Sequence, residues 1–368
     1  MRSPVRGAIV LVALYGFLAG VSMLEAGIKA LGDDFQDGLL DSVDNPLAGL
    51  FAGILATVLV QSSSVSTATV VGLVGSGALS VTTAVPIIMG ANIGTTVTNT
   101  LAALGSARRV EEFRRAFAGA TMHDFFNIIA VGIFLPLEIA TGFLARLAEW
   151  VAELLGGSVE GGTTRSPIKE AVREPVSIVK DLLEGFTDSQ RAVGTMLIVI
   201  ALGLIFVALA VITGNMRQLI ASRIESVLNR FVATGGGLVG MGVGLVTTVA
   251  VQSSSITTSI LVPMVGSGIL SVRNAFPITL GANLGTTITA LLAALAVDLR
   301  TGLVIALVHT LFNLSAIVLI YPIPAVRAIP VRLAEALANR AARNRMVVVL
   351  YTVGLFIVMP AVGLIVFR

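Results

Sequence analysis

The sequence contains one polar motif twice, each time inside a long apolar stretch. The Gln-Ser-Ser-Ser run at 61–64 returns at 252–255, and the run at 90–96 returns at 281–287, both 191 positions later. Polar groups at membrane depth are costly unless they line a cavity or bind a ligand. Paired polar interruptions in two apolar halves therefore indicate a binding site of the kind found at the midplane of membrane transporters.

The composition indicates an all-α integral membrane protein. Hydrophobic residues make up 55% of the chain and charged residues 12%, against about 25% charged in soluble domains. The apolar segments 7–23, 197–212, 303–320 and 346–367 are long enough, or nearly so, to cross a bilayer, which takes roughly 20 residues. We expect a multi-pass protein of the inner (plasma) membrane, surrounded by the lipid bilayer. No cysteine is present, so no disulfide forms.

The distribution of charge predicts a topology. Arginines mark expected cytoplasmic segments at 2–6, 108–115, 217–230 and 327–345, whereas the aspartate-rich loop 32–45 is expected outside. The net charge of +3 is explained by these orientation signals, so no nucleic-acid partner is expected. The predicted order is an N-terminal transmembrane helix (1–31), a first inverted repeat (46–155), a polar and extracellular linker (156–191), a transmembrane helix with a cytoplasmic amphipathic segment (192–230), a second inverted repeat (231–321), a basic cytoplasmic loop (322–345) and a C-terminal transmembrane helix (346–368).

Each repeat is predicted to hold a re-entrant helical hairpin and a broken transmembrane helix. In this topology the first Gln-Ser motif is approached from outside and the second from the cytoplasm, so the two structural repeats are inverted. The segment 46–80 is too short for two crossings, which favours a hairpin with the serines near its tip. Pro86 and Pro277 each stand four residues before a glycine and favour a kink or break, while Gly90 and Gly281 allow a sharp turn or close ligand approach.

The motifs have the chemistry for two kinds of ion. Helix N-termini at the hairpin tips offer N–H donors and partial positive charge to an oxyanion. Freed carbonyls and Ser, Thr, Asn and Gln oxygens suit a hard cation such as sodium. Neither motif contains Lys or Arg, so a bound anion needs charge balance from cations, from helix termini, or from both. This favours cotransport of a cation with an anion.

Structural roles compete with these functional ones. Serines in membrane helices often bond back to their own helix, and the pair Gly90 and Gly94 is also typical of a helix-packing surface. For His123 and His309, which occupy matching positions with Asn127 and Asn313, a hydrogen bond between helices is an alternative to a ligand role. Asp124 has no acidic counterpart in the second half, where Thr310 occupies the matching position. An intramembrane carboxylate is a functional candidate, and its alternative role is an interhelical hydrogen bond made in the protonated state.

Taken together, the motifs resemble the type II sodium-dependent inorganic phosphate cotransporter family, and the chain looks like a bacterial member. The resemblance covers nearly the whole chain and rests on both Gln-Ser runs and on segments 86–95, 114–121, 123–127 and 135–138. It implies sodium-driven uptake of inorganic phosphate through two inverted repeats with re-entrant hairpins.

The resemblance also implies the residues of the site. The phosphate-binding candidates are Gln61, Ser62, Ser63, Ser64, Asn92, Thr95, Ser253, Ser254, Ser255 and Asn283. The sodium candidates are Gln252, Ser253, Ala282, Thr286, Thr289, Asp124 and Asn127. Members that move net charge have an aspartate at the position of Asp124 and alanines at those of Ala118 and Ala120, so electrogenic transport is expected.

Three differences from animal members stand out. Ala91 and Ala282 replace serines, so at these positions only backbone carbonyls remain for coordination. The linker is short and lacks cysteines. The sequence ends one helix after the segment 327–345, which in the predicted topology puts Arg368 outside.

The predicted function is a sodium-coupled, electrogenic phosphate symporter that works by alternating access. It is expected not to be an enzyme and to need no cofactor, with sodium as coupling ion and phosphate as its partner. The alternatives are a sodium-coupled transporter of another small oxyanion or a dicarboxylate, an anion channel, and an intramembrane hydrolase, for which neither serine run has a nearby His–Asp pair. The oligomeric state is open, with a homodimer as one option.

Overall fold

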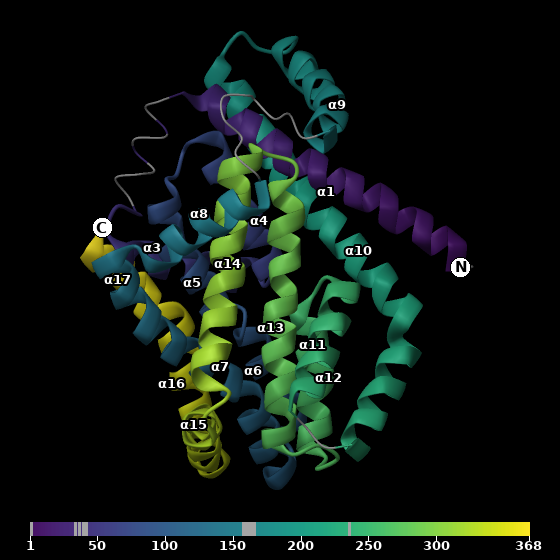
Figure 1. Ribbon diagram of the computed structural model, residues 1–368, viewed down its shortest axis with the longest axis vertical. Helices are drawn as coiled ribbons and strands as arrows, with labels where there is room; N and C mark the ends of the chain where they lie inside the picture. The colour runs from purple at the N-terminus through teal and green to yellow at the C-terminus, as the bar shows by residue number, and fades with distance from the viewer. Residues whose placement is uncertain (1–2, 33–34, 36–37, 39–42, 157–166, 235–236) are drawn as a thin grey trace.

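The structure is a computed structural model that describes residues 3–32, 35, 38, 43–156, 167–234 and 237–368, without the side chains of 3, 220–234 and 299. The described residues form helices and no strand (Figure 1). Seven described helices are long and apolar enough to cross a membrane, which confirms the predicted all-α membrane class. These are Pro4–Leu31, Val81–Ser106, Val110–Thr141, Gln190–Leu219, Val272–Ala294, Arg300–Ile320 and Met346–Phe367.

The first half contains a hairpin of two short helices followed by longer ones. Its helices are α1 (Ser3–Leu31), α3 (Pro46–Val60), α4 (Ser63–Ser76), α5 (Val81–Gly94), α6 (Val97–Ala103), the 3₁₀ turn η1 (Leu104–Ser106), α7 (Val110–Thr141) and α8 (Phe143–Gly156). Local caps define the starts of α3 and α5, because the side chain of Asn45 accepts from Leu47 N and that of Ser80 from Thr83 N.

The second half repeats the order of the hairpin and the long helix. Its helices are α9 (Pro167–Glu184), α10 (Gln190–Thr234), α11 (Leu238–Val251), α12 (Ser254–Gly266), α13 (Val272–Ala294), α14 (Leu299–Ile320), α15 (Pro324–Arg343), α16 (Met346–Val353), the π-helical segment η2 (Gly354–Val358) and α17 (Met359–Phe367). Ser271 caps α13 through Asn274 N, 191 positions after Ser80 caps α5.

The second helix of each hairpin packs against the long helices of the other half. Within each half the first hairpin helix packs along the long helix, α3 on α5 and α11 on α13. The second hairpin helices cross over: α4 packs against α13 and α14, and α12 packs against α6 and α7. This reciprocal packing brings the two Gln-Ser turns toward each other, while α1 and α10 run side by side along one flank (Figure 1).

Glycines allow the close approach of helices within each half. A Cβ atom at Gly90 would overlap the carbonyl group of Leu50 on α3, and one at Gly281 would overlap that of Met241 on α11. Both glycines lie inside continuous helices. The packing role therefore holds at these positions and the expected sharp turn is absent, while the expected close approach of a ligand stays a prediction.

The hairpin helices are too short to cross a bilayer singly. Helices α3 and α4 have 15 and 14 residues, and α11 and α12 have 14 and 13, against the roughly 20 residues of a full crossing. After the second helix of each hairpin the chain turns at a glycine with positive φ, Gly77 at 87° and Gly268 at 82°. These turns lie where the repeated sequence predicted the ends of the hairpins.

The predicted helix break occurs in only one half. Helix α5 ends at Gly94 and α6 begins at Val97, but in the second half α13 continues through the equivalent positions without interruption. The prolines do not cause the break, because Pro86 and Pro277 both lie inside helices. Instead, the N–H of Thr96 turns back to the carbonyl of Ile93 at 3.3 Å, a 3₁₀-type bond that ends the α-helical pattern.

The two segments predicted as a linker and a loop each contain a helix. The predicted basic loop 322–345 contains α15, which begins with Pro324 at its first turn and is rich in Ala, Leu and Arg, all good helix formers. The predicted linker 156–191 contains α9, which is fixed to α1 by a 3.0 Å ion pair between Lys169 and Glu25. The rest of that linker at 157–166 lies outside the described residues, as do Asp33, Asp34, Asp37, Asp41 and the side chains of Arg223 and Arg230.

Several arginine-bearing segments meet at one end of the molecule. Arg345, which follows α15, donates to the carbonyl of Ala107 at 3.0 Å, and Arg114 of α7 donates to Asn339 of α15 at 3.3 Å. Arg115 of α7 donates to the carbonyl of Gly266 at the end of α12 at 2.9 Å. The segments 108–115 and 327–345, which the charge map assigns to the same side of the membrane, thus lie together, and the side on which they lie stays a prediction.

Candidate functional site

The two Gln-Ser motifs have the same backbone conformation. Gln61 ends α3 with φ 57° and ψ 24°, and Gln252 ends α11 with φ 57° and ψ 30°. They are the only non-glycine residues with positive φ in the described part of the chain. Each glutamine side chain is held by its own helix, because Nε2 of Gln61 donates to Val58 O at 2.6 Å and Nε2 of Gln252 donates to Val249 O at 2.7 Å. A sparsely populated conformation that occurs twice in matching polar turns is typical of a functional site.

The first serine of each triplet caps the second hairpin helix. The hydroxyl of Ser62 accepts from Val65 N at 3.3 Å, and that of Ser253 accepts from Ile256 N at 3.4 Å. Helices α4 and α12 therefore begin at the two tips, each with its positive dipole end there. The third serine of the first triplet, Ser64, reaches the other half, and its Oγ lies 3.5 Å from Oγ1 of Thr289. Ser62 and Ser253 thus bond to their own helices as caps, whereas Ser64 contacts the other half.

A matched pair of threonines contacts the two glutamines. Thr98 Oγ1 donates to Gln61 Oε1 at 3.2 Å, and Thr289 Oγ1 donates to Gln252 Oε1 at 3.0 Å. The two threonines are themselves 191 residues apart. Thr289 was among the predicted site residues, but Thr98 was missed, although the offset of the repeat would have identified it.

Both tips line a single cavity. Its volume is about 240 Å³, and α10 lines one side of it with Phe206, Leu209, Ala210 and Thr213. From the hairpins it is lined by Val60, Gln61, Ser62, Ser63, Ser64, Val65, Gln252, Ser253, Ser254 and Ser255. None of these described lining residues is charged. The structure therefore brings two motifs 191 residues apart around one small space whose polar groups are neutral.

A second contact between the halves stands opposite the first. Oγ1 of Thr258 on α12 donates to Oδ1 of Asn99 on α6 at 2.5 Å, and both side chains are buried. Together with the contact between Ser64 and Thr289, this bond fixes each second hairpin helix to the long-helix layer of the other half. Neither Asn99 nor Thr258 was predicted, because Asn99 matches Ala290 and the pair does not follow the repeat.

A buried cluster of amides lies behind the tips. Asn283 Nδ2 donates to Asn127 Oδ1 at 3.2 Å and to Asn313 Oδ1 at 2.6 Å, and Asn127 Nδ2 donates to the backbone carbonyl of Asn92 at 2.9 Å. Asn92, Asn283 and Thr95, which were predicted to bind phosphate, are not among the residues that line the cavity between the tips. Thr95 donates to Ala91 O within its own helix. The structure thus separates these three from the Gln-Ser residues with which they were grouped.

The other predicted cation ligands divide between the two regions. Thr286 Oγ1 donates to the carbonyl of Ala282 at 3.2 Å on α13, the helix that also carries Thr289. Asn127 belongs to the amide cluster. In the described part of the chain no group of three or more Asp, Glu, His or Cys side chains is placed to hold a metal ion. A cation bound here would therefore depend chiefly on hydroxyl, amide and carbonyl oxygens.

Asp124 is fully buried in α7 and bonds to a helix at the other end of the sequence. Its Oδ2 accepts from the phenol of Tyr351 on α16 at 2.7 Å, whereas its Oδ1 is buried without a hydrogen-bond partner. The bond to Tyr351 is the interhelical contact that the sequence left open as an alternative. The unpartnered Oδ1 leaves one lone-pair face of the carboxylate available for a ligand. Sequence reasoning missed Tyr351, since nothing local marks it.

The two histidines are buried and do not occupy equivalent environments. His309 Nε2 lies 3.4 Å from Oδ1 of Asn92 and so joins the edge of the amide cluster. Both ring nitrogens of His123 are buried without a hydrogen-bond partner. An interhelical hydrogen bond of the kind expected is thus present for His309.

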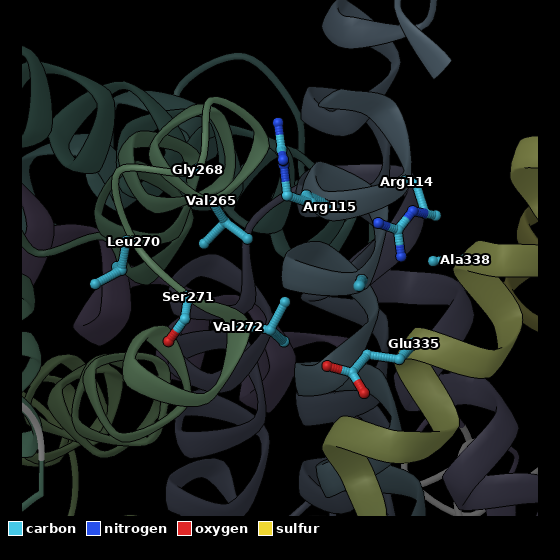
Figure 2. Close-up of a pocket in the computed structure, with 10 residues that line it drawn as sticks. Arg114, Arg115, Val265, Gly268, Leu270, Ser271, Val272, Glu335 and Ala338 are labelled. Carbon is cyan, nitrogen blue, oxygen red and sulfur yellow. The ribbon is translucent and has the colours of Figure 1, made fainter. Parts of the chain in front are cut away.

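A separate hollow lies at the base of the second hairpin, at the end of the molecule where the arginines gather. It has a volume of about 360 Å³, and Figure 2 shows Arg114 and Arg115 of α7 on one side of it and Glu335 of α15 on another. The turn between α12 and α13 contributes Gly268, Leu270 and Ser271. No residue of the Gln-Ser motifs lines it, so it is distinct from the cavity between the tips.

Comparison with known proteins identifies the family. The sequence profile of the Na+/Pi-cotransporter family matches residues 17–159 and 204–357, which are the two blocks that carry the hairpins. Among similar proteins, sodium-dependent phosphate transport protein 2A of Ovis aries is 36% identical over 95% of this chain, and that of Mus musculus is 37% identical over 96%. Sodium-dependent phosphate transport protein 2B of Homo sapiens is 33% identical over 94% of the chain. No solved structure gives a significant match.

The alignments cover nearly all of this chain but only part of the relatives. The chain spans 65% of the length of the Ovis aries protein, 66% of the Mus musculus protein and 63% of the Homo sapiens protein. The family match includes both Gln-Ser turns, the cavity between them and the helix that carries Asp124. On this match, which extends over more than half of its residues, the chain belongs to the Na+/Pi-cotransporter family.

Proposed function

We propose that the chain is a sodium-coupled symporter that imports inorganic phosphate across the plasma membrane and moves net charge in each cycle. The observation that carries this proposal is the small, uncharged cavity between the two Gln-Ser tips. The names of the relatives, which describe sodium-dependent phosphate transport, support the choice of cargo.

In this proposal phosphate binds between the tips. The N-terminal turns of α4 and α12 present backbone N–H groups and positive dipole ends there, and Ser63, Ser254 and Ser255 add hydroxyls. Since the described lining holds no Lys or Arg, two helix termini of about half a positive charge each leave about half of the charge of a divalent phosphate ion unbalanced. Bound sodium supplies the remaining positive charge, which is the physical reason for coupling.

Sodium is proposed to bind first, on the second half. The carbonyl oxygen of the Gln252 side chain and the hydroxyl of Thr289 already lie together, and Thr286 and the carbonyl of Ala282 are on the same helix. Asp124 and Asn127 are proposed to form a further sodium site that accounts for the net charge moved. Asn92, Thr95 and Asn283 do not line the cavity. They are proposed to contribute to phosphate binding indirectly, by holding the amide cluster and α5 in place behind the tips.

Alternating access is proposed to arise from the repeat. We propose that the halves are inverted and that the hairpins α3–α4 and α11–α12 are re-entrant. The contact between Ser64 and Thr289 and the bond between Thr258 and Asn99 join the halves near the cavity. For one half to rock or slide past the other, these two contacts must break and their hydroxyl and amide groups must bond to other partners.

The size of the cavity bears on the cargo. A water molecule takes up about 30 Å³ in the liquid, so a space of about 240 Å³ corresponds to about eight water molecules. This is enough for a tetrahedral oxyanion with part of its hydration shell or for a short dicarboxylate, so the choice of phosphate rests on the names of the relatives.

The decisive experiment measures radiolabelled phosphate uptake into proteoliposomes that contain the purified protein. An inward sodium gradient is compared with a potassium gradient, at zero and at inside-negative potential. Sodium-dependent uptake that accelerates at negative potential is the expected result. Uptake that is indifferent to sodium excludes coupling and favours a channel, and absence of uptake with sulfate uptake intact reassigns the cargo.

Two substitutions on neighbouring helices sharpen the experiment. Gln252→Ala removes the oxygen that Thr289 contacts, and it should lower the rate and raise the sodium concentration for half-maximal uptake. Thr287→Val is the matched control, because the hydroxyl of Thr287 bonds only to Leu284 O in its own helix. An unchanged sodium dependence in Gln252→Ala removes Gln252 from the sodium site.

A further inference from the structure

A third hollow, distinct from the two described above, lies between the start of α13 and α15. Its volume is about 560 Å³, and three arginines line it: Arg273 of α13 and Arg327 and Arg332 of α15. No acidic side chain is among its described lining residues, and none of the three guanidinium groups is ion-paired within the described residues. Three unpaired cations around one space attract an anion.

The backbone adds to this positive field. Arg273 and Asn274 lie in the first turn of α13, and Pro324 begins α15, so two helix N-termini meet at the hollow. Helix α15 has no side-chain cap at its N-terminus, which leaves its first N–H donors without a side-chain partner. The guanidinium of Arg327 lies 5.5 Å from the centre of the Tyr321 ring, a cation–π contact that restrains it at the rim.

Exposed apolar side chains stand next to two residues that line the hollow. Leu238 and Val239, which follow Gly237 at the start of α11, are 76% and 65% exposed, and Ile323, next to Pro324, is 52% exposed. In a membrane protein such side chains contact acyl chains. The hollow thus has a group of arginines that can bind an anion, next to apolar side chains that can contact acyl chains. A site for a free anion needs the arginines alone.

We propose that this hollow binds the headgroup of an anionic phospholipid, with the phosphodiester at Arg273, Arg327 and Arg332 and the acyl chains along the start of α11. Basic pockets between membrane helices are the usual sites for such headgroups. The inference is independent of the transport cycle proposed above. The lipid links α15 to the first turn of α13, the helix that carries Thr286 and Thr289.

Native mass spectrometry of the full chain in detergent tests this proposal, with dioleoylphosphatidylglycerol and dioleoylphosphatidylcholine as probes. The triple variant Arg273→Gln, Arg327→Gln, Arg332→Gln should retain the phosphatidylglycerol at least about tenfold less than the unmodified chain, since each arginine near an anionic lipid contributes roughly a fivefold factor. Retention of phosphatidylcholine should not change. Arg332 makes no contact with the Tyr321 ring, so the single variant Arg332→Gln leaves that contact in place. It should show a smaller loss of phosphatidylglycerol retention than the triple variant.

The matched control removes the same charge from the same chain outside the hollow. Arg108, Arg340 and Arg343 are exposed and line neither this hollow nor the cavity between the tips. Their triple replacement by Gln should leave phosphatidylglycerol retention unchanged. An equal loss in the control, or no preference for phosphatidylglycerol in the unmodified chain, overturns the proposal.

Free inorganic phosphate is the other source of the same chemistry. Inorganic phosphate at 100-fold excess over the lipid is expected not to displace it, because the acyl chains contribute to binding. Displacement at equal concentration would overturn the lipid assignment and make the hollow a phosphate site. The thermal unfolding midpoints of all variants are measured alongside, and the exposure of the three arginines predicts that these stay within a few degrees of the unmodified chain.

Discussion

The phenol of Tyr351 donates a 2.7 Å hydrogen bond to Oδ2 of Asp124, across 227 residues of sequence. The bond fixes the carboxylate of α7 against α16 while Oδ1 stays without a hydrogen-bond partner. If sodium binds at Asp124 as proposed, the bond from Tyr351 would orient the carboxylate, and we infer a positioning role for Tyr351 in that site.

Tyr351→Phe should weaken sodium binding without abolishing transport. Loss of a hydrogen bond to a charged group costs about 1.5–3 kcal/mol, which corresponds to roughly a tenfold or larger rise in the sodium concentration for half-maximal uptake if the orientation of Asp124 is lost. Sodium titrations of phosphate uptake measure this. The maximal rate should fall less than the affinity, and an unchanged sodium titration would show that the bond is only structural.

Asp124→Gly should abolish the transport current and spare part of the phosphate uptake. The substitution removes the one carboxylate among the proposed sodium ligands, so the cycle should carry less positive charge. Electrical recording from proteoliposomes on a solid-supported membrane, paired with tracer uptake, measures both. Glu138→Gln is the matched control on α7, because Glu138 is also buried but accepts from Leu144 N and Ala145 N as a cap of α8. A current of normal size in Asp124→Gly contradicts its assigned role.

Thr98→Val and Thr289→Val should both slow uptake, but through different ions. Each removes the hydroxyl that contacts the glutamine of one tip, a bond with a net value of about 1 kcal/mol, so a decrease of about fivefold is expected. Thr289→Val should also raise the sodium requirement, whereas Thr98→Val should mainly raise the phosphate requirement. Equal sodium shifts in both variants would mean that the two halves bind sodium alike.

Gly244→Ala should destabilise the protein, and Gly242→Ala, two residues away on α11, should not. A Cβ at Gly244 would overlap the carbonyl of Ile278 on α13, while a Cβ at Gly242 meets no atom within 4 Å. Overpacking costs about 1–3 kcal/mol and more where backbone must move, whereas an unhindered Gly→Ala change in a helix stabilises by up to about 1 kcal/mol. Thermal unfolding midpoints in detergent compare the two, and equal midpoints would contradict the close packing of α11 on α13.

The sequence by itself determined the membrane class, the two hairpins and the pairing of Gln61 with Gln252. These rest on local signals, namely apolar length, capping residues such as Ser80 and Ser271, and a repeat at a constant offset. Apolar length and capping residues act within a single helix or turn, and the repeat is visible within this one chain. All three can therefore be detected from the sequence alone. Thr98 also matches Thr289 at the offset of 191 residues, so the repeat predicts a site residue that lies outside the two motifs.

Only the tertiary structure decided which groups surround the cavity and what holds Asp124. The wall formed by Phe206 and Thr213 of α10 and the bond from Tyr351 arise where segments distant in sequence pack together, and no local pattern marks them. The continuity of α13, against the break in α5, was also decided there. The near-identical motifs thus have different surroundings, since α6 packs against α12 and α7, whereas α13 packs along α4 and α14. Contact across the halves, rather than propensity within them, fixes these features.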